Sequence, residues 1–325
     1  CPKTGISFFP QLSREPGPVG FISHSGSLAN ILGRIGTDRG IRFSKAVSLG
    51  NECDLTCADL LTYLGNDAET RVIGAYVEGV KDGPSFLAAL KAASRNKPVV
   101  LWKVGMTSEG SRAASSHTGA LAGSRAVWQG VLRQGGAVPV VGFESLVDSL
   151  MGFSLLPADL GDRIAILSAP GGFAVAAAEA CGTVGLKLAE LSRESRSGLV
   201  EFVPPTGTSI RNPVDVGLSA SLDTEIYMRA ARIVAADPGV DAVVVIGRGM
   251  TEESNRLYAE SLIQTRNAHG KPFLVVGIPG FNEGFADGFF QAGVPFFETA
   301  ERALSVYAQV RRYQLWREDQ WNTRP

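Results

Sequence analysis

The chain contains the same order of segments twice, and this repeat constrains the fold more than any other feature. "VGFISHSGS" matches "IAILSAPGG", "KPVVLWKVG" matches "KPFLVVGIPG", and "GAVPVVGFESLVDSLMGF" matches "GVPFFETAERALSVYAQV". Self-similarity of this kind indicates a duplicated structural unit. Each half alternates short apolar runs with helical patterns, which predicts a parallel sheet covered on both faces. The predicted fold class is therefore α/β, with two tandem doubly wound parallel-sheet domains.

The boundary between the two predicted domains falls in "LLPADLGD", residues 155–162. Helical patterning stops there, and Pro, Asp and Gly cluster, as is typical of a linker. We therefore expect one domain over residues 1–158 and a second over 159–325. Two domains of ordinary size also agree with a length of 325 residues.

Charge and cysteine content exclude several classes of protein. The 31 basic and 32 acidic residues give a formal net charge of −1, without a basic stripe, so nucleic acid is not an expected partner. Four cysteines are too sparse for a disulfide framework, and "CDLTC" lacks a second ligand pair, so neither disulfides nor a metal site is predicted. A cytoplasmic location follows as the expectation.

No apolar run approaches the ~18 residues of a membrane span, and no signal peptide is evident. Because the chain begins with Cys rather than Met, we expect it to be a piece of a longer protein.

His117 lies in "RAASSHTGALAGS", among small residues that allow a helix start to approach a ligand closely. The stretch after it is predicted to be helical once its glycines are passed, and a helix N-terminus favours an anion. A neutral imidazole is a competent nucleophile toward phosphorus. Two interpretations stay open at this point: a phosphorylated histidine, or a surface histidine in a polar loop.

Two further segments place polar residues where strands are predicted to end, the edge at which open α/β sheets bind ligands. In "SHSGSLAN", Ser25, Gly26 and Ser27 offer donors to an oxyanion, or simply cap a helix. Neighbouring His24 is interpreted as a side chain directed away rather than as a second nucleophile. Glu78 ends "IGAYVEG" and could fix the tautomer of an imidazole, or be a solvated strand-end glutamate.

Two loops have weaker signals. Gly50 and Asn51 follow the predicted strand in "SLGNECD" and either line the pocket of a small carboxylate or phosphate, or form a plain turn. The loop "TSIRNPVDVG" contains the polar residues Arg211, Asn212 and Asp215 and is stiffened by Pro213. It is expected to be a surface turn, with an interface or pocket as the alternative.

Together these residues resemble the CoA-ligase half of the NDP-forming acyl-CoA synthetases, the group that contains succinyl-CoA synthetase and ADP-forming acetyl-CoA synthetase. The family's phosphohistidine segment, H-x-G-A-x-x-A-G, is matched by His117, Gly119, Ala120, Ala122 and Gly123. Its S-x-S-G-[ST]-L turn is matched by Ser23, Ser25, Gly26, Ser27 and Leu28, and its Glu-Gly strand end by Glu78 and Gly79. The resemblance covers nearly the whole chain and implies two flavodoxin-like domains. The duplicated arrangement and the "NPVD" loop are closer to the ADP-forming acetyl-CoA synthetases.

The resemblance implies that His117 takes a phosphoryl group from ATP and passes it to a small carboxylic acid. The thiol of CoA then displaces phosphate from the acyl phosphate. Glu78 would orient His117, and two helix starts would hold the phosphate. The phosphate-binding residues implied in this way are Ser25, Gly26, Ser27, Thr118, Gly119 and Ala120.

The same resemblance implies partners that these 325 residues do not include. CoA, and ATP with Mg²⁺, would enter as substrates through a CoA-binding Rossmann domain and an ATP-grasp domain, on the same polypeptide or on a partner subunit. Phosphate on His117 would be the one covalently bound group.

Two other classes of protein stay open. One is a regulatory module of the same fold that binds an anion or a CoA ester without turnover. The other is a two-lobed periplasmic-type binder, against which the missing signal peptide and the His-x-Gly-Ala run count.

Overall fold

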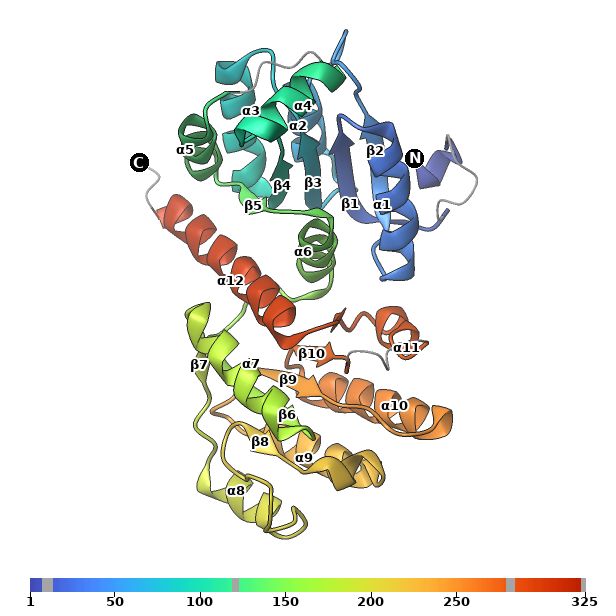
Figure 1. Ribbon diagram of the computed structural model, residues 1–325, viewed down its shortest axis with the longest axis vertical. Coiled ribbons are helices and arrows are strands. Elements are labelled where there is room, and N and C mark those ends of the chain that lie inside the picture. Colours follow the sequence, from blue (N-terminus) through green and yellow to red (C-terminus); the bar gives the residue numbers. More distant parts are fainter. Residues whose placement is uncertain (8–13, 119–122, 279–283, 323–325) are drawn as a thin grey trace. The chain divides into compact units, whose positions relative to one another are not determined.

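The computed structural model describes residues 1–7, 14–118, 123–278 and 284–322 (Figure 1). The chain forms two compact units: unit 1 comprises Cys1–Ser154 and Arg312–Pro325, and unit 2 comprises Leu155–Arg311. The predicted boundary between residues 158 and 159 thus lies close to the division between Ser154 and Leu155. The sequence pattern did not indicate that the last part of the chain groups with unit 1. Its contacts explain this, because the Tyr313 hydroxyl donates to the carbonyl of Ser94 at 2.8 Å.

Unit 1 is built on a five-stranded sheet in the order β2-β1-β3-β4-β5, and all its strand pairs are parallel. Its strands are β1 (Pro16–Ser23), β2 (Phe43–Ser48), β3 (Val72–Val77), β4 (Val99–Lys103) and β5 (Val138–Val140). Its helices are η1 (Pro2–Thr4), α1 (Gly26–Asp38), α2 (Cys57–Asn66), α3 (Gly83–Asn96), α4 (Ser108–Thr118), α5 (Arg125–Gly135) and α6 (Phe143–Leu155). Helix α3 spans the residues predicted from "GPSFLAALKAASRN".

Both faces of the first sheet are covered. On one face, Ile22 and Ile73 pack with residues of α2, α3 and α5, including Leu61 and Phe86. Successive residues of a strand point to opposite faces. A Cβ on Gly74, next to Ile73, would lie 3.0 Å from a methyl group of Leu150, which places α6 on the other face. The predicted two-sided parallel sheet is therefore confirmed in unit 1.

Unit 2 repeats the plan with a six-stranded sheet in the order β11-β10-β9-β6-β7, to which β8 adds beside β6. Its strands are β6 (Arg163–Ser168), β7 (Lys187–Leu188), β8 (Val214–Asp215), β9 (Ala242–Ile246), β10 (Phe273–Val276) and β11 (Phe296–Phe297). Its helices are α7 (Gly171–Thr183), α8 (Arg193–Val200), η2 (Leu218–Ser221), α9 (Thr224–Ala236), α10 (Glu252–His269), α11 (Asp287–Gln291) and α12 (Ala300–Asn322), whose residues from Arg312 belong to unit 1.

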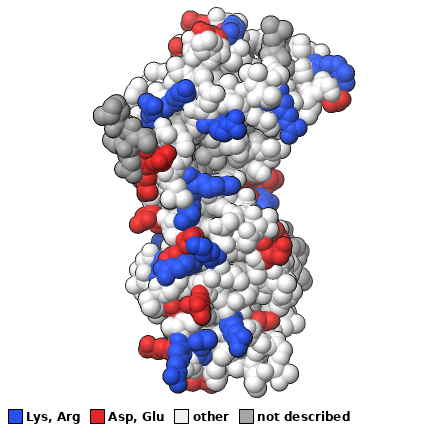
Figure 2. All heavy atoms as spheres, turned by 90° about the vertical axis from the view of Figure 1, so that its left-hand side faces the viewer, with Lys and Arg blue, Asp and Glu red and all other residues white. Residues whose placement is uncertain are grey.

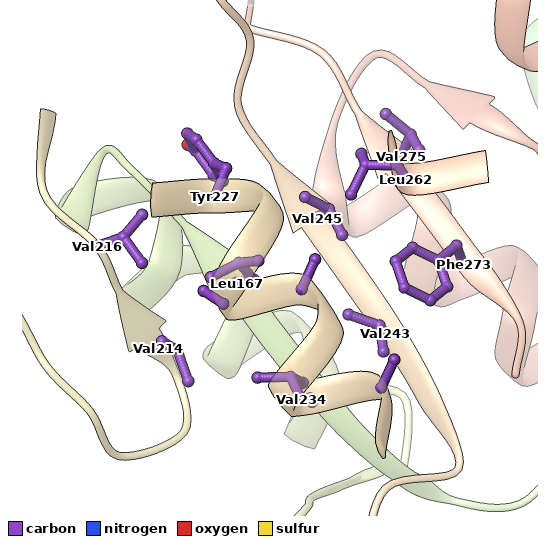
Figure 3. Packing of buried hydrophobic residues seen from close by; sticks show 14 of the residues in the cluster. Leu167, Val214, Val216, Tyr227, Val234, Val243, Val245, Leu262, Phe273 and Val275 are labelled. Carbon is purple, nitrogen blue, oxygen red and sulfur yellow. The ribbon is translucent and has the colours of Figure 1, made fainter. Parts of the chain in front are cut away.

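The core of unit 2 lies between its sheet and helices α9 and α10. Leu167, Val243 and Val245 of the sheet pack with Tyr227 and Val234 of α9 (Figure 3). Alternate strand residues face this cluster, as the period of two requires. Because all strand pairs of unit 2 are parallel as well, the second predicted parallel-sheet domain is confirmed.

The "NPVD" loop has a structural role in unit 2. Asn212 Oδ1 accepts a hydrogen bond from the N–H of Ile166 at 2.9 Å. Its Nδ2 donates to the carbonyls of Ile164 and Ala189 at 2.7 and 2.9 Å. The amide thus satisfies main-chain groups of β6 and of the residue that follows β7. The expectation of a plain surface turn is wrong for Asn212, because its side chain takes the place of a strand neighbour.

The surface agrees with the near-neutral composition. On the face drawn in Figure 2, basic and acidic side chains lie interspersed. Within the described ranges, no helix is both long and apolar enough to span a bilayer.

Candidate functional site

The candidate site lies at the carboxyl edge of the first sheet, between β1 and β3. From β1 the chain passes through α1 to β2 on one side, and later returns to β3 on the other side. Ligands bind at such a topological switch point in open α/β sheets. Ser23 pairs with Tyr76 in the ladder, so the turn after β1 faces the residue after β3. That residue is Glu78.

The serine turn after β1 begins helix α1. Ser25 is its N-cap, and its Oγ accepts from the N–H of Leu28 at 3.3 Å. Ser23 Oγ accepts from the N–H of Ser25 at 3.1 Å, which fixes the turn. Gly26 and Ser27 are the exposed first residues of α1, where main-chain N–H groups have no acceptor within the helix. The turn is thus both a structural cap and a suitable place for an anion.

Glu78 is 4% exposed, so the interpretation of a solvated strand-end glutamate is wrong. The hydroxyl of Tyr76 donates to its Oε1 at 3.2 Å. Burial and the neighbouring Glu78 carboxyl raise the pKa of Tyr76 to about 12. Because that hydroxyl stays protonated at neutral pH, Tyr76 remains a hydrogen-bond donor to Glu78.

Lys103, at the end of β4, is a site neighbour that sequence reasoning missed. Its Nζ donates to the carbonyls of Glu78, at 2.8 Å, and Val104. The ammonium group also lies 4.5 Å from the ring centroid of Trp128. Burial lowers the pKa of Lys103 to about 8, against the opposing effect of Glu78. The signal in the sequence was a charged residue that ends the apolar run "VVLWK".

His24 is also buried, and its contacts define its tautomer. Its Nδ1 accepts from the main-chain N–H of Glu78 at 3.1 Å, and its Nε2 lies 3.1 Å from Oε1 of Glu52. Because a backbone N–H can only donate, Nδ1 has no proton and Nε2 donates to Glu52. His24 is therefore a neutral imidazole inside the protein, in contact with the candidate site and not simply directed away.

His24, Glu52 and Cys57 are close enough to suggest a metal centre, because their ligand atoms lie within 4.8 Å of one another. The hydrogen bonds argue for a different arrangement. Nε2 of His24 has its proton directed at Glu52, and a metal ligand needs a free lone pair at that nitrogen. Glu52 Oε1 also accepts from the N–H of Cys57 at 2.7 Å. Burial, and secondarily Glu52, raise the pKa of the Cys57 thiol, which opposes the thiolate that a metal requires.

Gly50 and Asn51 form a turn that directs the next residue inward. Gly50 has φ 56° and Glu52 has φ 52°, both in the left-handed region. Asn51 is exposed, whereas the side chain of Glu52 is buried. A substrate contact of Gly50 and Asn51 stays a prediction.

His117 lies in the last turn of α4, and Thr118 is the last residue of this helix. The prediction that a helix starts near Thr118 is wrong for Thr118 itself, because this residue ends α4. The helix predicted after the glycines is confirmed, since α5 begins at Arg125. Gly119 and Ala120 lie outside the described residues. A phosphate-binding role for Thr118, Gly119 and Ala120 stays a prediction.

These features agree with those of known proteins. Residues 16–153 match the family described as succinyl-CoA ligase like flavodoxin domain. The chain is 35% identical over 307 residues to the alpha subunit of ADP-forming acetate–CoA ligase II from Pyrococcus furiosus, over 92% of this chain and 66% of that subunit. It is 32% identical over 318 residues to the ADP-forming 4-hydroxybutyrate–CoA ligase from Nitrosopumilus maritimus, over 95% of this chain and 44% of that ligase.

A solved structure is similar over almost the whole chain. It is the dinucleotide forming acetyl-coenzyme A synthetase 1 of Ca. Korarchaeum cryptofilum, in complex with phosphate and ADP. The TM-score is 0.84 at 29% identity, over 97% of this chain and 68% of that one.

Fold and switch-point site together define an α/β protein of the succinyl-CoA ligase type. The chain belongs to the superfamily of NDP-forming acyl-CoA synthetases. The resemblance and the two flavodoxin-like domains predicted from the sequence are thereby confirmed. The chain spans 66% of the length of the Pyrococcus subunit and 44% of the Nitrosopumilus ligase.

Proposed function

We propose that this chain is the CoA-ligase part of an ADP-forming acyl-CoA synthetase, with His117 as the phosphoryl carrier. The observation that carries the proposal is the position of α4, which lies beside Gly105 near the main-chain carbonyl of Glu78. A Cβ placed on Gly105 would lie 3.4 Å from Cβ of Ala114 and 3.6 Å from the carbonyl oxygen of Glu78. His117 follows Ala114 by three residues in α4. This supports a pairing of His117 with Glu78 at the switch point.

The proposed reaction has three transfers. A nitrogen of His117 attacks the γ-phosphorus of ATP, and ADP leaves. A carboxylate oxygen of the acid then attacks the phosphorus, which frees His117 and forms an acyl phosphate. The CoA thiolate finally attacks the acyl carbon, and phosphate leaves.

The residues of this chain have separate tasks in the proposal. Glu78 accepts a hydrogen bond from one imidazole nitrogen of His117 and stabilises the charge that develops on the ring. Ser25, Gly26 and Ser27 at the start of α1 bind the phosphoryl oxygens. Gly50 and Asn51 border the position of the acid.

CoA and Mg²⁺-ATP reach His117 through other parts of the assembly in this proposal. The chain matches only part of its relatives' length, which supports a CoA-binding Rossmann domain and an ATP-grasp domain, on the same polypeptide or a partner subunit. The relatives are named as ligases, which favours catalysis over the anion-binding module. A cytoplasmic location remains part of the same proposal.

The test is the intact mass of the chain before and after exposure to phosphoramidate, a phosphoryl donor that needs no nucleotide site. We expect one phosphate adduct that is lost in acid, survives base, and is absent in His117→Asn. Uptake of phosphate by His117→Asn to the same extent would contradict the assignment. A folded wild-type chain without an adduct would favour the binding module.

A further inference from the structure

Two buried side chains fix the main chain of Glu78 from both sides. Nδ1 of His24 accepts from its N–H at 3.1 Å, and Nζ of Lys103 donates to its carbonyl at 2.8 Å. All three residues are buried. Because both peptide groups are held, the backbone conformation of Glu78 is restricted. The direction of the Cα–Cβ bond that carries its carboxyl group is restricted with it.

His24 also connects Glu78 to the serine turn. Its main-chain N–H donates to the carbonyl of Tyr76 at 3.2 Å, while its ring accepts from Glu78. It lies between Ser23 and Ser25, the residues that form the turn. The turn and the acid are therefore coupled through one residue.

Glu52 holds the imidazole in the tautomer that this contact requires. Its Oε1 accepts the proton of His24 Nε2 at 3.1 Å and is itself held by the N–H of Cys57 at 2.7 Å. Its carbonyl accepts from Lys81 Nζ at 2.5 Å. A φ of 52° is unfavourable for a residue with a Cβ, and such conformations cluster at functional sites. Here the unfavourable conformation turns the carboxylate of Glu52 toward His24.

We propose that His24 is a positioning residue for Glu78, and that Glu52 fixes the tautomer of His24. The inference rests on the proposed function, in which Glu78 orients His117. His24 acts through the main chain of Glu78 and needs no contact with the phosphoryl group. It supplies one acceptor and one donor, a pair that a glutamine amide also offers.

The experiment compares phosphorylation rates with phosphoramidate for the wild-type chain, His24→Leu and His24→Gln. Leucine removes both hydrogen bonds, and we expect the rate to fall roughly 10- to 100-fold, since small misplacements at a reacting centre have effects of this size. Glutamine restores an acceptor and a donor, and we expect a rate within about threefold of wild type. Thr70→Val is the matched control, because it also removes two side-chain hydrogen bonds of the same unit, to Ser44 at 2.7 Å and to Asp67 Oδ2 at 2.6 Å. Thr70 precedes β3, whereas Glu78 follows it, so the control lies at the other end of the strand. Thermal unfolding of all four proteins establishes that each is folded.

A second measurement is independent of the reaction. The ¹⁵N spectrum of His24 in the wild-type chain is expected to show a neutral ring with its proton on Nε2. A proton on Nδ1 would overturn the inference whatever the rates.

The outcomes separate the two proposals. Equal rates for folded His24→Leu and wild type overturn the positioning role alone. A loss in Thr70→Val as large as in His24→Leu, or no recovery in His24→Gln, assigns His24 a structural role only. Absence of phosphate on the folded wild-type chain overturns the proposed function, and the positioning role with it.

Discussion

The two units share a backbone plan but differ in chemistry at the same edge of their sheets. Ser23 pairs with Tyr76 in unit 1, and Ser168 pairs with Ile246 in unit 2. Glu78 follows Tyr76 by two residues in unit 1, and Arg248 follows Ile246 by two residues in unit 2. One duplicated framework thus presents a buried acid at one position and a guanidinium at the other.

The residue after each serine shows the same divergence. The main-chain N–H of His24 donates to the carbonyl of Tyr76 at 3.2 Å, and that of Ala169 donates to the carbonyl of Ile246 at 3.3 Å. The backbone contact is common to both units, but alanine cannot form the side-chain bonds of His24. Next along the chain, Ser25 caps α1 with its side chain, whereas Pro170 at the start of α7 makes no such bond.

Contacts remote from this edge are retained. Lys97 Nζ donates to the carbonyl of Asp67 at 2.5 Å, and Lys271 Nζ donates to that of Asp237 at 2.5 Å. The repeat therefore kept a contact that supports the sheet and changed the side chains at the carboxyl edge of the sheet. The comparison teaches that this fold supplies a place for a site, and that a few side chains decide its chemistry.

The largest effect is expected from Glu78→Gln, which removes the acid that distinguishes unit 1. The amide keeps the shape but cannot stabilise a charged imidazole, so we expect phosphorylation by phosphoramidate to slow by about 100-fold. Intact mass followed over time measures the rate. Glu179→Gln, an exposed position on α7, is the control and should match wild type. An unchanged rate in Glu78→Gln would show that the acid which distinguishes unit 1 from unit 2 does not take part in phosphorylation.

Asn212→Ala tests the claim that the "NPVD" loop of unit 2 supports the sheet. The variant leaves the N–H of Ile166 and the carbonyls of Ile164 and Ala189 without their side-chain partner. We expect the free energy of unfolding to fall by about 2 kcal/mol, the range for lost buried partners. Denaturant titration measures this. Exposed Asn267→Ala should change stability by less than about 0.5 kcal/mol, and an equal loss in both variants would argue against the assignment.

Lys103 has no counterpart in unit 2, where Gly277 follows β10 at the same place. Its pKa is lowered from 10.5 to about 8 on folding, so the folded chain binds fewer protons than the unfolded chain between these values. Its contribution to stability is therefore least favourable below about pH 8 and rises toward pH 10.5. Denaturant unfolding of wild type and Lys103→Met across this pH range should show the free energy of unfolding of wild type rising relative to that of the variant. A difference that is constant with pH would mean that Lys103 does not titrate there.

Ser25→Ala is expected to have the smallest effect. Loss of the N-cap hydrogen bond to the N–H of Leu28 should lower the free energy of unfolding by about 1 kcal/mol. Ser197→Ala, at an exposed position within α8, has no cap to lose and should show no such decrease. If both variants lost the same stability in thermal unfolding, the N-cap of α1 would contribute nothing measurable. The capped helix α1 would then not differ in stability contribution from the uncapped helix α7.

Much of the architecture was readable from the sequence, but the local structure around His117 was not. Apolar runs such as "RVIGAYV" predicted the strands because period and composition act locally. In "SEGSRAASSHT" the serines have no strong preference for helix, so the pattern gave no clear start. Gly119 and Gly123 were interpreted as preceding a helix, and α5, which begins at Arg125, confirms this, but helix α4 with His117 in its last turn was not predicted. A helix with weak intrinsic preference depends on tertiary packing, here of Ala114 beside Gly105.

The sequence by itself determined the duplicated α/β plan and the location of Glu78 at the end of a strand, because hydrophobic periodicity and strand polarity are local properties. The tertiary structure decided which polar groups meet at that edge. His24 reaches Glu78 across 54 residues, and Lys103 reaches it across 25. Parallel pairing of β1, β3 and β4 sets those meetings through strand register, which no local pattern specifies. Burial then makes these hydrogen bonds necessary, since polar groups withdrawn from water must find partners within the protein.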